Sequence, residues 1–140
     1  MKSTTYFAVF EPSKTGYGVY FPDLLGCITV GETIEEAKLN AEEVLGLHLW
    51  GMEKDGEEIP TPTIPPFENE ELETNCFIMP ITIFMDLVRN EMETKAVKKT
   101  LTIPYWLNEM AEKENVNFSK LLQFALVEYL QVQEKEKKLV

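Results

Sequence analysis

The sequence predicts an α+β protein built from two parts, and three observations predict it. Short segments rich in aromatic and β-branched residues alternate with turn residues near the start of the chain. A long amphipathic helical pattern follows them. After residue 90, a stretch of alternating residues leads into two further helical patterns. We therefore expect a small antiparallel sheet with a helix in residues 1–90, and one strand with two helices in residues 91–140.

Three strands are expected first, at residues 6–10, 17–21 and 27–30. The connections between them are short and contain proline and glycine, which are turn residues. Short connections join antiparallel neighbours, so the strands should form a meander.

A helix is expected after Thr33, because Thr33 and Glu36 form a capping box. Its apolar side chains recur at helical spacing and should lie on the sheet: Ile34, Ala37, Ala41, Val44, Leu45 and Leu49. Much of the remaining surface is acidic: Glu32, Glu35, Glu36, Glu42 and Glu43. Leu47 and Trp50 widen the apolar surface, either as extra core or as a patch for a partner. The helix should end at residues 54–56.

Residues 60–75 combine four prolines with four glutamates and fit no regular element, so they predict a long surface loop. A fourth strand is expected at residues 76–84. Pro80 lacks a backbone N–H, so this strand should lie at a sheet edge or carry a bulge. Residues 86–92 suit a short helical linker.

The formal net charge of −11 is unevenly distributed. Residues 1–90 hold 16 Asp and Glu against 5 Lys and Arg, whereas residues 91–140 hold eight Lys and eight Glu. An acidic surface attracts basic partners and repels nucleic acid, although a merely solvated surface has the same composition. The neutral tail, with its local lysine clusters, can still contact phosphate.

In the tail, residues 95–103 alternate between apolar and polar side chains, which predicts a strand. Pro104 suits the first turn of a helix over residues 105–113, which should bury Leu107, Met110 and Ala111. Asn117 is a good cap for a second helix over residues 118–133.

One strand and two helices are too small to bury a core alone, and a lone strand has no pairing partner. We therefore expect a symmetric homodimer whose two strands pair antiparallel, an arrangement that resembles the ribbon-helix-helix fold. The dimer contacts should come from Leu101, Ile103, Leu122, Leu126 and Tyr129. In that family the ribbon enters the major groove of DNA. The residues expected to contact DNA are Lys98, Lys99, Thr100 and Thr102 on the ribbon, and Asn117, Ser119 and Lys120 at a helix N-terminus. The alternative is an ordinary exposed strand with solubilising side chains.

One run of residues in the front part is distinctive: Tyr-Phe-Pro-Asp-Leu-Leu-Gly-Cys at residues 20–27, followed by Thr29, Gly31, Thr33, Glu35, Glu36, Ala37, Asn40 and Ala41. With the helix after it, this run resembles the HicB antitoxin family, although Leu25 stands where proline is usual. The resemblance implies a reduced ribonuclease H-like fold and a partner, HicA, a small basic toxin that cleaves mRNA using a histidine. It also implies that the protein covers the toxin's active surface and represses its own operon, in a heterotetramer or larger complex with the toxin. On charge and expected exposure, the candidate toxin contacts are Asp23, Leu24, Glu35, Glu36, Glu42, Glu43 and Trp50.

We expect no enzymatic activity, no cofactor and no bound metal. The first strand carries no acid in its interior, so the carboxylates of a nuclease should not converge on Mg²⁺. The single histidine, His48, suits packing better than catalysis, and the two cysteines form no metal-ligand pattern. No run of 18 apolar residues and no secretory segment occurs, so a cytoplasmic protein without a membrane span is expected. Two alternatives to the antitoxin remain open, a transcription regulator with a ligand-sensing front part and a degenerate nuclease.

Overall fold

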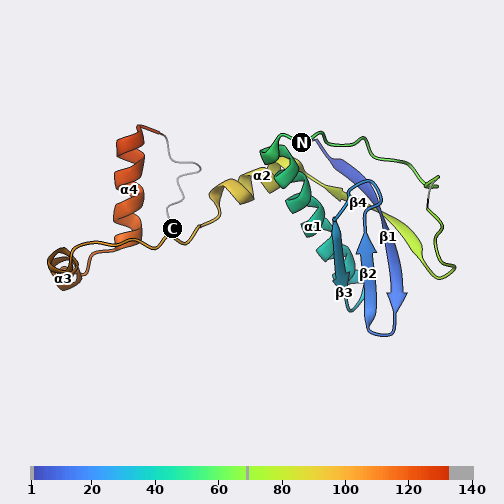
Figure 1. The fold of residues 1–140 in the computed structure, drawn as a ribbon, viewed down its shortest axis with the longest axis horizontal. Helices are drawn as coiled ribbons and strands as arrows, with labels where there is room; N and C mark the ends of the chain where they lie inside the picture. The colour runs from blue at the N-terminus through green and yellow to red at the C-terminus, as the bar shows by residue number, and fades with distance from the viewer. Residues whose placement is uncertain (1, 69, 133–140) are drawn as a thin grey trace. The chain divides into compact units, whose positions relative to one another are not determined.

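The computed structural model describes residues 2–68 and 70–132 (Figure 1). Contacts between Cα atoms divide the chain into two compact units, Met1–Asn90 and Glu91–Val140. Each unit is described separately below. Among the described residues, no helix is both long enough and apolar enough to cross a membrane.

The first unit contains a four-stranded antiparallel sheet in the order β3-β2-β1-β4. The strands are β1 (Thr4–Ser13), β2 (Gly16–Tyr20), β3 (Ile28–Gly31) and β4 (Phe77–Ile83). All four predicted strands are therefore present. The predicted turn at residues 11–16 is shorter than expected, because β1 continues to Ser13 and pairs it with Gly16 of β2.

One face of the sheet is covered by helix α1 (Ile34–Asp55), as Figure 1 shows. The predicted cap is confirmed, since the Thr33 side chain accepts a hydrogen bond from the Glu36 backbone N–H at 3.1 Å. Gly56 ends the helix in the left-handed conformation, with φ of 70°. The apolar stripe is confirmed at Ala37, Ala41, Leu45 and Leu49, but Ile34 lies at the helix start and is 40% exposed.

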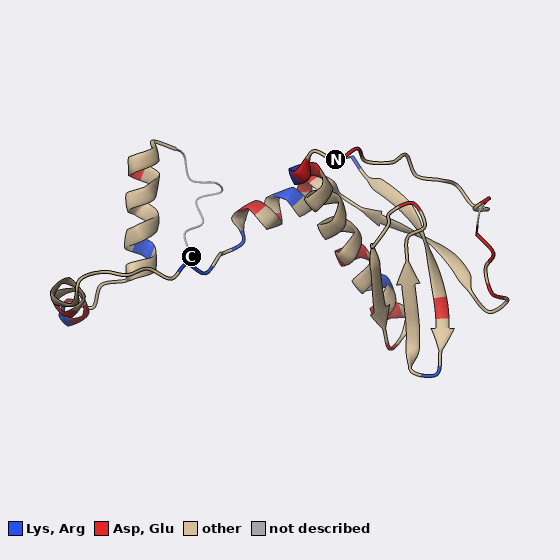
Figure 2. Cartoon of the chain, viewed as in Figure 1, with Lys and Arg blue, Asp and Glu red and all other residues tan. Residues whose placement is uncertain are grey.

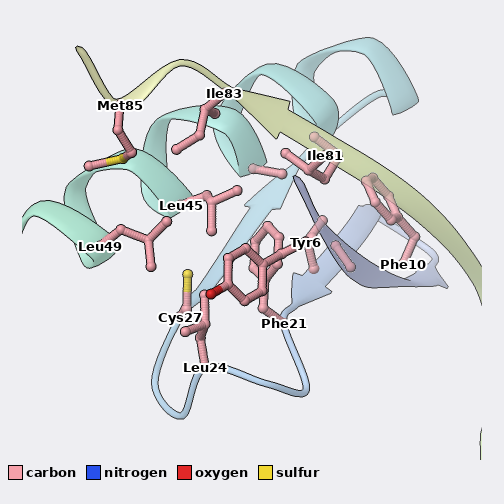
Figure 3. Packing of buried hydrophobic residues seen from close by; sticks show 14 residues of the cluster. Tyr6, Phe10, Phe21, Leu24, Cys27, Leu45, Leu49, Ile81, Ile83 and Met85 are labelled. Atoms are coloured by element: carbon pink, nitrogen blue, oxygen red, sulfur yellow. The ribbon is translucent and has the colours of Figure 1, made fainter. Parts of the chain in front are cut away.

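The hydrophobic core lies between α1 and the face of the sheet that α1 covers, called the inner face here (Figure 3). Phe10 of β1 stacks on Phe77 of β4 with ring centroids 5.2 Å apart. Fourteen buried side chains form a single cluster: Tyr6, Ala8, Phe10, Val19, Phe21, Leu24, Cys27, Ala37, Ala41, Leu45, Leu49, Ile81, Ile83 and Met85. All of them belong to the first unit, so this unit has a core of its own.

Both sheet edges are modified in ways that discourage further strand pairing. β4 lies at one edge and contains Pro80, which confirms the edge position expected from its missing N–H. At the other edge, the side-chain amide of Asn40 in α1 donates a 2.8 Å hydrogen bond to the Val30 carbonyl of β3. A strand-like partner would have to displace Asn40 to reach that carbonyl.

Helix α2 (Met85–Thr94) confirms the predicted helical linker and begins on the first unit. Met85 is buried in the core. Val88 packs closely at Gly46 of α1, where an added Cβ would lie 3.0 Å from a Val88 methyl group. The Arg89 guanidinium binds the Glu53 carboxylate of α1, with its closest N–O distance at 2.7 Å.

The second unit contains helices α3 (Tyr105–Lys113) and α4 (Phe118–Leu130). The bounds of α3 and the Asn117 cap match the prediction, and the Asn117 side chain accepts from the Lys120 N–H at 3.0 Å. Helix α4 ends before the expected residue 133, which lies outside the described residues. Residues 95–104 form no strand in the single chain, because a strand requires a partner for its hydrogen bonds.

No described residue of the second unit is buried. The expectation that Leu107, Met110 and Ala111 are buried within this unit is wrong for the single chain, since Leu107 is 41% exposed, Met110 60% exposed and Ala111 only half-buried. Two helices without a third layer cannot enclose these side chains.

Candidate functional site

Acidic side chains are spread over the first unit, on α1 and on the connection between α1 and β4 (Figure 2). Glu35, Glu36 and Glu43 of α1 are exposed, and Glu42 is half-buried. The Glu36 carboxylate also accepts a 3.3 Å hydrogen bond from the Glu32 N–H, just before the Thr33 cap. The acidic residues predicted on α1 are therefore accessible to a partner.

Asp23 is already occupied within the chain. Its Oδ2 accepts from the Thr63 backbone N–H and its Oδ1 from the Thr63 hydroxyl, both at 2.7 Å. Residues 57–76, named the strap here, contain Thr63 and connect α1 to β4. Asp23 thus fastens the strap rather than presenting an unpaired carboxylate.

Two tyrosines of the sheet hold the strap at other points. The Tyr6 hydroxyl donates to the Pro60 carbonyl, and the Tyr20 hydroxyl donates to the Glu70 carboxylate at 2.7 Å. Burial, with the Glu70 hydrogen bond as the second cause, raises the pKa of Tyr20 well above its usual range. The predicted loop at residues 60–75 has no helix or strand in its described part, yet three side chains attach the strap to the sheet unit.

The expected exposure of Leu24 is wrong. Leu24 is 2% exposed and points into the core beside Cys27 (Figure 3). Two backbone hydrogen bonds turn the chain here, from Leu24 N–H to the Phe21 carbonyl at 3.0 Å and from Cys27 N–H to the Leu24 carbonyl at 3.1 Å. The turn brings Leu24 inward and leaves Leu25 98% exposed.

Trp50 and His48 of α1 are both half-buried. Trp50 packs against the core, and the Lys54 ammonium lies 5.5 Å from its ring centroid. Part of the Trp50 ring therefore belongs to the core, which was one of the two interpretations expected for it. The rest of the ring is accessible to a partner. Cys27 is fully buried, and burial raises the pKa of its thiol to about 12.

The outer face of the sheet, opposite α1, holds residues that the sequence prediction of the site missed. On β3, Ile28 and Val30 are 66% and 69% exposed, whereas Thr29 is half-buried and Gly31 is buried. Beside them lies an open hollow of about 670 Å³ whose lining includes Glu11, Gly18, Val30, Glu32 and Glu36. The alternation of residues 28–30 was a signal for this face, but it does not reveal which side α1 covers.

In the second unit, every residue predicted to contact DNA is exposed: Lys98, Lys99, Thr100, Thr102, Asn117, Ser119 and Lys120. The first four lie in the extended segment before α3, and the last three lie at the N-terminus of α4. The predicted dimer residues are also uncovered, with Leu101 59%, Ile103 42%, Leu126 47% and Tyr129 84% exposed and Leu122 half-buried.

Carboxylates of the first unit do not gather in the manner of a nuclease site. Among the residues that the structure describes, no group of three or more His, Cys, Asp or Glu is placed to hold a metal ion. Glu11 lies on β1 at the outer face, whereas Asp23 is bound to the strap.

Comparisons with known proteins identify a family. The family model of HicB-like antitoxins of bacterial toxin–antitoxin systems matches residues 6–128. An uncharacterized 14.9 kDa protein of Haemophilus phage HP1 is 35% identical over 100 residues, covering 71% of this chain and 72% of that protein. The antitoxin HicB 2 of Photorhabdus laumondii is 39% identical over 62 residues, covering 44% of this chain and 45% of that protein.

A solved structure is similar in fold. A chain in a toxin–antitoxin complex from Streptococcus pneumoniae is 26% identical, with a TM-score of 0.56, and the match covers 91% of this chain and 99% of that chain. Because the family model spans most of the sequence and includes the distinctive run at residues 20–27, the chain belongs to the family of HicB-like antitoxins of bacterial toxin–antitoxin systems.

Proposed function

We propose that this protein neutralises a HicA-type mRNA-cleaving toxin by covering its active surface with the first unit, and that it represses its own operon through the second unit. The observation that carries the proposal is the separation of charge in a chain of this family. The acidic excess lies entirely within residues 1–90. An acidic, independently cored unit suits a basic protein partner, whereas the neutral second unit suits DNA.

The acidic charge of the first unit supports a mechanism in which this unit mimics the charge of RNA and blocks the active surface of the toxin. A toxin that cleaves mRNA must present a basic surface to phosphate, and an acidic antitoxin can bind that same surface. Glu35, Glu36, Glu42 and Glu43 on α1, with the accessible part of Trp50, are candidates for the acidic surface that attracts the toxin. Asp23 acts through the strap, because both of its oxygens bind Thr63.

Dimerisation of the second unit is proposed from its lack of a core. The single chain leaves large apolar side chains of α3 and α4 uncovered, Tyr105, Trp106, Met110, Leu121, Phe124 and Leu130 among them. Removal of apolar surface from water favours association. We infer that two copies pair residues 95–103 as an antiparallel ribbon, which places Leu101 and Ile103 inward and Thr100 and Thr102 toward the DNA.

The test is co-expression with a small basic HicA-type protein, to be sought in the reading frames beside this gene. Growth should be rescued from the toxin, and the two proteins should purify together in a complex that binds a DNA fragment from upstream of the operon. Binding of the toxin and binding of the DNA fragment should both weaken as the salt concentration rises. Failure to bind any such protein, together with binding of a small ligand, would favour the ligand-sensing regulator instead.

A further inference from the structure

We infer that the toxin partner docks on the outer face of strands β2 and β3, with a basic side chain seated in the hollow beside Gly18, rather than on the length of helix α1. This inference rests on the proposed function and names the surface that performs it. The occupant is a basic segment of the toxin.

The apolar side chains of β3 point away from the core. Ile28 and Val30 lie on the outer face at 66% and 69% exposure, while Thr29 and Gly31 face α1. An edge strand normally directs its apolar residues inward and its polar residues to water. Leu25 lies just before β3 in the sequence and is 98% exposed, so it adds to the exposed apolar surface. Such a group of exposed apolar side chains marks a contact surface.

Gly18 lines a hollow at the end of this face where β1 and β2 form their hairpin. It pairs with Val30 on one side and with Glu11 on the other, so the outer face has no side chain between them. A Cβ built at Gly18 would meet only the Glu11 carbonyl oxygen, at 4.0 Å, which means that the space is empty rather than filled by neighbours. Glu32 and Glu36 also line the hollow, so three of its lining residues are glutamates.

The chemistry of this hollow fits a lysine or arginine. The alkyl part of such a side chain can lie on Val30 over Gly18, and its charged end can reach the carboxylates of Glu11, Glu32 and Glu36. A partner cannot readily add a strand, because Asn40 occupies the Val30 carbonyl and Pro80 lies in the other edge strand. It must therefore dock through side chains on the face.

The experiment measures the affinity of the full chain for its neighbouring basic protein, made inactive by replacement of its catalytic histidine. Three variants change the face: Gly18→Thr fills the hollow, Glu11→Lys reverses one carboxylate, and Val30→Ala removes apolar contact. Two matched controls lie on α1. Asp55→Lys, at an exposed carboxylate near the end of α1, makes the same change of charge as Glu11→Lys, and Leu39→Ala removes a side chain that is 66% exposed, close to the 69% of Val30. Thermal unfolding of every variant confirms that it is folded.

We expect Gly18→Thr and Glu11→Lys to raise Kd by about tenfold or more, and Val30→Ala by about threefold, with both controls within about twofold of the unchanged protein. If the α1 controls weaken binding and the three face variants do not, the inference is overturned while the proposed function stands. If the unchanged chain does not bind the basic protein at all, the proposed function falls and this surface falls with it.

Discussion

Replacing Asp23 by alanine should release the strap without unfolding the sheet. Thr63 loses two 2.7 Å hydrogen bonds, one from its backbone N–H and one from its hydroxyl. An exposed hydrogen bond contributes about 1 kcal/mol, so the loss is about 2 kcal/mol of local stability. Since 1.4 kcal/mol is a factor of ten, the strap should open about 30 times more often.

Hydrogen exchange measures this directly, because the Thr63 amide is one of the two donors. In Asp23→Ala the amides of residues 57–76 should exchange faster, and proteases should cut there first. Thr63→Val removes only the hydroxyl bond and should give about half of the effect. Asp23→Asn, which keeps one acceptor oxygen, should do the same.

The toxin affinity decides between the two roles of Asp23. Release of the strap should weaken binding only modestly in Asp23→Ala, and Thr63→Val should follow in proportion. The reasoning is refuted if Asp23→Ala reduces affinity more than about tenfold while exchange at Thr63 is unchanged, because Asp23 would then contact the toxin itself.

Three further predictions follow from the structure. Gly31→Ala should destabilise the first unit by about 3 kcal/mol, because the new Cβ would lie 2.4 Å from the Ala37 nitrogen, whereas Gly51→Ala meets nothing within 4 Å and should stabilise it by about 0.5–1 kcal/mol; chemical denaturation compares the two. Hydrogen bonds from Arg89 lower the pKa of Glu53, so the pair stabilises the fold above the ordinary glutamate pKa and stops doing so as pH falls through the lowered value. Because Arg89 is 42% exposed, Arg89→Ala should cost only about 0.5–1 kcal/mol at pH 7, and the cost should shrink as the pH falls through the lowered pKa of Glu53, in urea titrations over a series of pH values; a cost that does not change with pH would exclude the ion pair as the cause. Thr100→Ala or Lys98→Ala should weaken operator binding by about 1–3 kcal/mol while leaving the dimer and toxin inhibition intact, and a loss of all three activities together would show that the two units are not functionally separate.

Local chemistry made much of the fold predictable. Thr33 and Asn117 cap their helices, Gly56 ends α1, and Pro80 identifies an edge strand, because each depends on residues within a turn or on one missing N–H. The bounds of α3 followed in the same way from Pro104 and the spacing of its apolar residues.

The candidate site was less predictable because it depends on contacts between distant parts of the chain. Asp23 meets Thr63 across 40 residues, and nothing in the sequence near Asp23 indicates that partner. Leu24 and Leu25 are identical side chains, and only the turn between Phe21 and Cys27 decides that the first is buried. The outward position of Ile28 and Val30 depends on which face α1 covers, and period-two alternation does not report that choice.

The segment 95–103 illustrates a different limit. Its alternating pattern predicts a strand, but the single chain offers nothing for it to pair with. The ribbon can form only when two chains associate. Analytical ultracentrifugation across a micromolar range of protein concentration would detect such a dimer.

The most direct test of the account is the affinity of residues 1–90 alone for the inactive toxin, compared with the full chain. This fragment contains the whole buried core, so it should fold without residues 91–140. We expect a Kd within about tenfold of the full chain, weakening as salt is raised, and no binding of operator DNA. A folded fragment that does not bind the toxin, or that binds it with no dependence on salt, would contradict an acidic toxin-binding unit separate from the DNA-binding tail.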